Sequence, residues 1–162
     1  MQVPDQQTVR KAFVNSSRSK AASATFPGTW PPAGADELDV VGWTDPKAPR
    51  RGYLVLGPEV AGEVLALELR LPSEAPTHRK TMCDLCQTQD APDGSRLVVA
   101  PRAGARGKAG DTVGLYVCTD FGCSLRARQP LKEHQKPVMG GPDLRVPDLV
   151  GRLREFVDRV RA

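Results

Sequence analysis

Four cysteines are the residues of this chain whose type and spacing most clearly predict chemistry. Cys83 and Cys86 have two residues between them, Cys118 and Cys123 have four, and the chain contains no other cysteine. Two thiolates this close in sequence can reach the same ion from a tight turn, and two such pairs complete the tetrahedral sphere of Zn²⁺. The pattern therefore predicts one zinc ion. Because four thiolates leave no position for water or substrate, we expect a structural metal.

A thioredoxin-type redox pair at Cys83 and Cys86 is the alternative interpretation of the first pair. Such a motif needs a parallel strand followed by a helix, and it leaves the second pair unexplained.

Support for catalysis elsewhere is weak, because His78 and His134 are the only histidines and neither has ligand or triad spacing. We expect both on the surface. Phosphate-binding and dinucleotide glycine motifs are absent from the sequence, so we expect a non-enzyme without a small-molecule substrate.

The predicted elements around the cysteines would bring the two pairs together. The first pair precedes a hairpin of strands over 96–100 and 112–118, with a basic glycine-rich loop at 102–111. Cys118 ends the second strand, and Cys123 lies in the opening of a helix expected over 119–128, where the positive helix end favours a thiolate. Turn, hairpin and helix in this order are typical of a treble-clef zinc finger. The predicted fold class is α+β, with this finger, antiparallel hairpins and flanking helices.

The remaining sequence predicts short elements packed on the finger. Asp5 is the candidate N-cap of a helix over 5–16, and the segment 26–49 is expected to be irregular, with Trp30 and Trp43 as buried anchors. Strands over 53–56 and 63–71 form a hairpin in which alternate leucines share one face.

A proline-rich connector over 130–147 leads into a last amphipathic helix over 148–161, whose apolar stripe is expected to dock on the body. We divide the chain into an N-terminal α+β portion (1–81), the zinc finger (82–129), and the connector with the C-terminal helix (130–162).

The net charge of +4 is concentrated in one region. Residues 96–136 carry an excess of five positive charges, and the rest of the chain carries a net charge of −1. Such a region indicates an acidic partner, either nucleic acid or an acidic protein face, although a solvated surface has the same composition. The candidate partner-binding residues lie on the hairpin loop and the finger helix, and are Arg102, Arg106, Lys108, Arg126 and Arg128.

Length and composition restrict the class of protein further. The chain has 162 residues, of which 40% are apolar and 26% charged, so it should fold in water. We found neither a secretory leader pattern nor an apolar run long enough to span a bilayer. We therefore expect a cytoplasmic protein with no membrane partner, in a compartment where thiols stay reduced.

Several stretches together resemble the elongation-factor-G-binding proteins, the family that includes the fusidic-acid-resistance proteins, through their C-terminal treble-clef domain. The resemblance spans most of the chain and is carried by residues 9–15, 38–50, 82–86 and 112–124, together with Arg102, Gly104, Gly107 and Gly110. It implies a non-enzymatic factor that docks on the GTPase elongation factor G (EF-G) at or near the ribosome. In the resistance proteins such a factor helps to release EF-G when the drug traps it there. It also implies that the four cysteines are the metal ligands.

A zinc module that binds ribosomal RNA is the alternative function, since a basic finger attracts the RNA backbone. Aromatic residues are only 5% of the chain, and the finger offers only Tyr116 and Phe121. We expect both of them in the core, which disfavours a stacking platform for single-stranded RNA and favours a protein partner.

Overall fold

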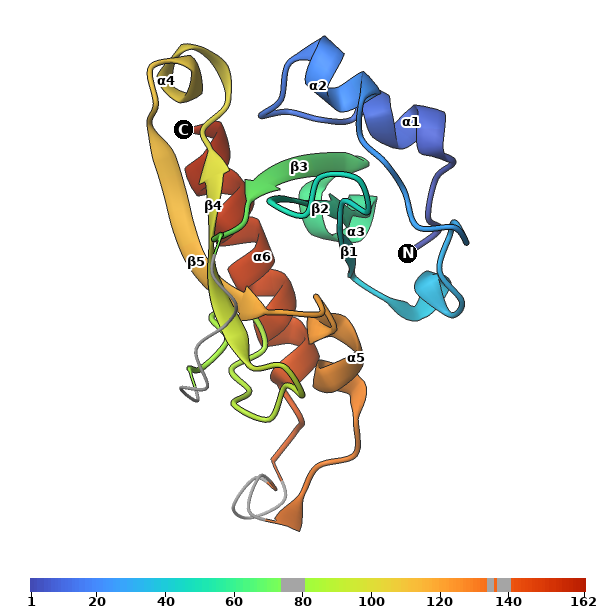
Figure 1. Ribbon diagram of the computed structural model, residues 1–162. Helices are drawn as coiled ribbons and strands as arrows, with labels where there is room; N and C mark the ends of the chain where they lie inside the picture. Colours follow the sequence, from blue (N-terminus) through green and yellow to red (C-terminus); the bar gives the residue numbers. More distant parts are fainter. Residues whose placement is uncertain (74–80, 134–135, 137–140) are drawn as a thin grey trace.

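Alternating apolar residues build an antiparallel sheet from the middle of the chain. The computed structural model describes residues 1–73, 81–133, 136 and 141–162. His78 and His134 lie outside these residues, so their predicted surface positions are untested. Within the described part, five strands follow one another in the sheet in chain order (Figure 1). They are β1 (Val40–Thr44), β2 (Arg51–Leu56), β3 (Leu65–Arg70), β4 (Ser95–Pro101) and β5 (Thr112–Cys118).

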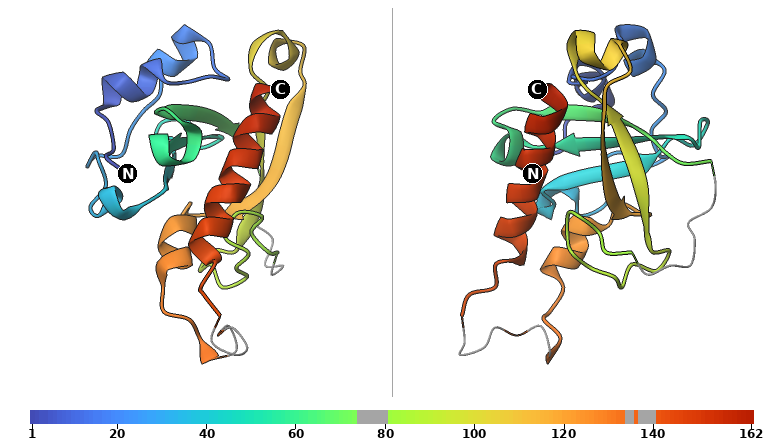
Figure 2. Two further views of the ribbon diagram at one scale, coloured as in Figure 1. Left: turned by 180° about the vertical axis from the view of Figure 1, so that it is seen from behind. Right: turned by 90° about the vertical axis from the view of Figure 1, so that its left-hand side faces the viewer.

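The long helix α6 (Arg145–Arg161) covers one face of this sheet (Figure 2). Its stripe of Leu149, Leu153, Phe156 and Val160 is buried against leucines and valines of the strands, as predicted. The helix starts three residues before the predicted position. Pro147 does not prevent this, because a proline in the first turn of a helix removes an N–H that has no partner there.

The N-terminal segment covers the opposite face of β1, β2 and β3. It contains α1 (Gln6–Lys11) and α2 (Arg18–Ala22), which pack over an aromatic cluster that includes Trp43 and Tyr53. Asp5 caps α1 as predicted, since its Oδ1 accepts from the backbone N–H groups of Gln7 and Thr8 at 2.8 and 3.0 Å.

The predicted helix over 5–16 is too long. Helix α1 ends at Lys11 because the chain then extends along β3, where the Val14 N–H donates to the Ala66 carbonyl at 3.1 Å. The prediction of irregular structure over 26–49 is also wrong in part, because it contains β1 and a 3₁₀ turn over Ala35–Glu37. Trp43 is buried as predicted, whereas Trp30 is only half-buried.

Both predicted hairpins are present. Strands β2 and β3 pair antiparallel through a connection that contains α3 (Pro58–Ala61), and β4 and β5 pair from Ser95↔Cys118 to Pro101↔Thr112. The basic loop of the second hairpin forms a short helix, α4 (Gly104–Lys108). The finger helix, α5 (Cys123–Arg128), begins later than predicted because residues 119–122 form a turn between two of the cysteines.

The three portions of the chain distinguished in the sequence share one apolar core. Leu67 of the first, Val117 of the second and Leu153 of the third belong to the same cluster of buried residues. The boundaries between the portions stay a prediction. No helix of the described residues combines the length and apolar character that a membrane crossing requires.

Candidate metal centre

Two tight turns present the four cysteines. In the first turn, the Gln87 N–H donates to the Cys83 carbonyl at 2.8 Å, and Gln87 adopts a positive φ of 54°. In the second turn, the Phe121 N–H donates to the Cys118 carbonyl at 2.8 Å, and Phe121 has a φ of 56°. Left-handed backbone is uncommon in residues other than glycine. Both turns therefore hold a strained residue next to or between the ligands.

The turns bring all four sulfurs to one point. The Sγ atoms lie within 4.8 Å of one another, with 3.6 Å between Cys83 and Cys123 and 3.5 Å between Cys86 and Cys118. Zinc–sulfur bonds of about 2.3 Å in a tetrahedron place sulfurs about 3.8 Å apart. The four thiols are free of disulfides, and only Cys86 is not fully buried. The donor set and its spacing therefore fit one tetrahedral zinc ion, whose role here is to cross-link the two turns.

The thiols of the cluster cannot all ionise without a cation between them. Hydrogen bonds from Cys118 and the other cysteines lower the pKa of Cys83. The pKa of Cys123 is raised well above its ordinary value by its hydrogen bonds to the other three sulfurs, Cys118 first, and by burial. A divalent ion removes this conflict, because each thiolate then faces a positive charge.

The first turn is attached to β5 and to α6. Asp84 binds the edge of β5 twice: its backbone N–H donates to the Tyr116 carbonyl at 2.8 Å, and its side-chain Oδ2 accepts from the Tyr116 backbone N–H at 2.6 Å. Arg152 of α6 donates from Nη1 to the Leu85 carbonyl at 3.0 Å. Sequence analysis missed Asp84 and Arg152, since nothing in their spacing indicates a contact made only in the folded chain.

The second turn, between Cys118 and Cys123, packs against β1 and β2. The buried side chain of Phe121 lies over two glycines, so closely that a Cβ atom added to Gly42 would be 2.7 Å from the Phe121 Cβ. Arg96 lies 5.5 Å from the centre of the Phe121 ring and donates to the Thr119 carbonyl at 3.2 Å. The prediction that Phe121 belongs to the core is confirmed. The prediction for Tyr116 is wrong, because its side chain points to the outer face of the hairpin and is 39% exposed.

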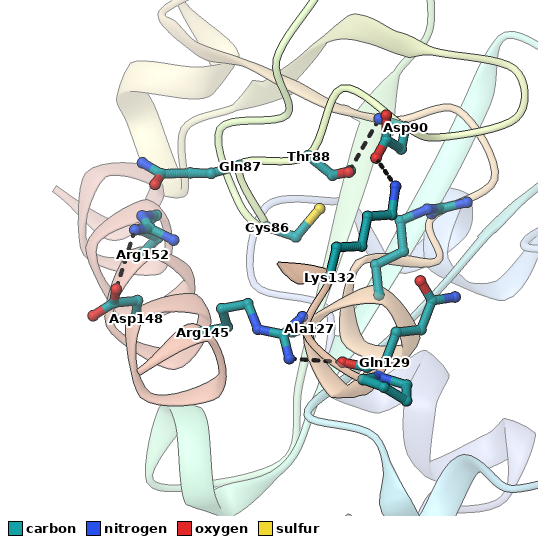
Figure 3. A pocket seen from close by; sticks show the side chains of 12 residues that line it. Cys86, Gln87, Thr88, Asp90, Ala127, Gln129, Lys132, Arg145, Asp148 and Arg152 are labelled. Carbon is teal, nitrogen blue, oxygen red and sulfur yellow. Dashed lines mark hydrogen bonds and ion pairs between the residues drawn. The ribbon is translucent and has the colours of Figure 1, made fainter. Parts of the chain in front are cut away.

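Cationic side chains line the hollow on the Cys86 side of the cluster, where a zinc tetrathiolate would carry a net charge of −2. The pKa of Arg126 is raised, first by its hydrogen bonds to Asp120 and then by the charges of Cys118 and Cys86. Figure 3 shows the hollow beside Cys86, in which the guanidinium of Arg145 donates to the Gln129 carbonyl at 2.6 Å. Arg126 therefore offsets part of the thiolate charge, and its ion pair with Asp120 holds it in place.

The five candidate partner-binding cations do not form one surface. Arg102, Arg106 and Lys108 lie at the α4 end of the second hairpin, and Arg126 and Arg128 lie on α5 at the other end (Figures 1 and 2). Their role in partner binding stays a prediction.

Four of the five candidates also have a structural contact. Arg102 and Arg106 donate to the carbonyls of Arg159 and Ala162 at the end of α6, and both pair with Asp111. Arg126 pairs with Asp120 at 2.6 Å, and Arg128 pairs with Asp39. Lys108 is the one candidate without a hydrogen bond or ion pair among the described residues.

The fold and the site together define a zinc-binding protein of the treble-clef type, in which a turn, a hairpin and a helix place four cysteines around one structural zinc ion. The family model of the FBP C-terminal treble-clef zinc-finger matches residues 8–160, which is nearly the whole chain, and the chain belongs to this family. The comparison with curated proteins gave no match, and neither did the comparison with solved structures.

Proposed function

We propose that this protein is a non-enzymatic adaptor that binds elongation factor G at or near the ribosome. The observation that carries the proposal is membership of the FBP C-terminal zinc-finger family over residues 8–160, together with the resemblance to the elongation-factor-G-binding proteins. The closed metal site supports a binding role, because a four-thiolate zinc stiffens a surface without offering a position for substrate.

The finger end of the molecule is the surface that suits a protein partner. Exposed apolar side chains lie next to the metal ligands, with Met82 beside Cys83 and Leu125 two residues after Cys123. Leu125 is 59% exposed on α5. Protein interfaces are anchored by a few apolar or aromatic side chains inside a polar rim. Arg126 and Arg128 follow Leu125 on the same helix and would supply that rim.

Calorimetric titration of purified EF-G with the zinc-loaded protein tests the proposal, with and without ribosomes. We expect binding that survives nuclease treatment. Leu125→Glu should weaken it at least tenfold, about 1.4 kcal/mol, because a charge would enter an apolar contact. Leu97→Glu is the matched control, since Leu97 is 45% exposed and lies on β4 rather than on the finger helix. Absence of binding to EF-G, both alone and on ribosomes, would refute this function.

A further inference from the structure

Two neighbouring hollows lie at the end of the molecule opposite to the finger helix. One, of about 190 Å³, is lined by the turn after α1, the end of β3 and α4. The other, of about 540 Å³, lies along α1 and α2. Ser16 lines both hollows, so the two adjoin at this residue, and we call them together the α2–α4 surface. Figure 1 places α2 and α4 at this end and α5 at the other, and the two views of Figure 2 agree.

The α2–α4 surface is strongly positive. Among the described residues, Glu68 is the one carboxylate that lines the two hollows, and it is 4% exposed and paired with Arg51 at 3.5 Å. Seven cations line the hollows. They lie on α1, α2, β3 and α4 and just after β4, and are Arg10, Lys11, Arg18, Lys20, Arg70, Arg102 and Lys108.

Most of these cations have no side-chain hydrogen bond or ion pair within the described part of the chain. Arg10 donates to the Ala24 carbonyl at 3.2 Å and lies over the ring of Phe26, and Arg102 pairs with Asp111. The others are exposed, and they form no side-chain hydrogen bond or ion pair within the described part of the chain: Lys11, Arg18, Lys20, Arg70 and Lys108. Sequence analysis named only Lys108 of these five, because the fold, not the sequence, places it beside Lys20 and Arg70.

The chemistry of this surface favours a phosphate backbone over an acidic protein. A protein partner needs apolar anchors. The large apolar side chains that the described residues leave exposed all lie elsewhere, and none lines either hollow. Phe13 is the one aromatic residue among the described residues that line the hollows, and it is half-buried and packs against Tyr53 at 5.5 Å, so the surface offers no row of rings on which successive bases could stack.

We propose that the α2–α4 surface binds the phosphate backbone of double-stranded RNA without reading its sequence. Helices α2 and α4 have five residues each, too short to enter a DNA major groove as a recognition helix. The wide, shallow minor groove of A-form RNA instead presents phosphates to cations spread over a concave surface. This inference goes beyond the binding of EF-G and does not depend on it.

Fluorescence anisotropy with a labelled RNA duplex of about 20 base pairs tests the proposal on the zinc-loaded full chain. Raising the salt from about 50 to 200 mM should weaken binding roughly a hundredfold or more, as expected for four or five phosphate contacts. Two RNA duplexes of unrelated sequence should bind equally. A DNA duplex of the same length should bind more weakly.

The double variant Lys20→Glu with Lys108→Glu should weaken RNA binding roughly tenfold or more and lower the salt slope by about 2. The matched control is Lys132→Glu with Lys136→Glu. It makes the same change in charge near the finger, where Lys132 lines the hollow beside Cys86 and the two lysines are 57% and 56% exposed, and RNA affinity should change less than threefold. Zinc content and circular dichroism verify folding, and Lys20→Gln with Lys108→Gln replaces the first variant if it misfolds.

Three results would overturn the proposal. The first is no binding of RNA at low salt. The second is a greater loss of affinity in the Lys132 and Lys136 variant than in the Lys20 and Lys108 variant, which would place RNA at the finger end. The third is tighter binding of another polyanion, either polyglutamate at equal charge concentration or DNA, which would assign the surface to an acidic protein or to DNA.

Discussion

At the scale of single residues, the contact between Gly42 and Phe121 connects the zinc finger to the rest of the sheet. Phe121 lies between two metal ligands, and its ring fits over β1 and β2 only because positions 42 and 52 carry no side chain. Sequence analysis placed Gly42 in an irregular segment and gave it no role. A glycine within Val40-Val41-Gly42-Trp43-Thr44 is a signal of close approach in a strand, but the sequence does not identify the partner.

Gly42→Ala should lower the free energy of unfolding by about 1–3 kcal/mol. The new Cβ would be 2.7 Å from the Phe121 Cβ and 2.8 Å from the Leu54 Cδ2, so the second turn must shift. Urea unfolding measures the change. Gly114→Ala is the control, because Gly114 is also in a strand, and a Cβ there is 3.4 Å from the nearest described atom. Equal stability of the two variants would show that Phe121 does not depend on the space at Gly42.

At the scale of elements, the basic loop of the second hairpin has a structural role that its composition does not indicate. The Ala103 N–H donates to the Val160 carbonyl at 2.7 Å, and Arg106 donates to the Ala162 carbonyl at 2.8 Å. The last carbonyls of a helix have no partner within the helix, and cations near them are favourable. The loop therefore caps α6.

Arg106→Glu should lower the free energy of unfolding by up to about 1 kcal/mol, since Arg106 is 55% exposed and solvent screens its contacts. Lys108→Glu, two residues away on the same helix, should change it by less than about 0.5 kcal/mol. Chemical denaturation of both variants measures the free energy of unfolding, and the difference between them separates the loss of the α6 cap from the general effect of a reversed surface charge. Should the two variants be equally stable, the assignment of Arg106 to the cap fails.

Elements with a strong local pattern could be predicted from the sequence. The alternation in β3 and the apolar stripe of α6 gave the correct faces, because period 2 and period 3.6 persist over whole elements. Strand β1 was missed because prolines and glycines surround only five residues of strand. The shortening of α1 could not be foreseen, since it depends on a contact between Val14 and Ala66, far apart in the sequence.

At the scale of the whole molecule, the spacing of the cysteines predicted the metal centre, whereas the arrangement of charge required the fold. Four thiols in two closely spaced pairs predict both the ligands and the metal, because few other sites use this pattern. A count of charges along the chain, however, joined Arg106 and Arg126 into one group, and the fold places them at opposite ends of the second hairpin. The fold also placed Lys20, Arg70 and Lys108 together from three distant segments.

The central claim is that one zinc ion joins the two cysteine turns and holds the finger in shape. Native mass spectrometry before and after a strong chelator, followed by hydrogen exchange, tests it most directly. We expect the mass of the chain with one zinc ion, and loss of exchange protection in residues 83–128 when the ion is removed, because a structural zinc contributes on the order of 10 kcal/mol. A metal-free chain with full protection in that segment at neutral pH would contradict the account.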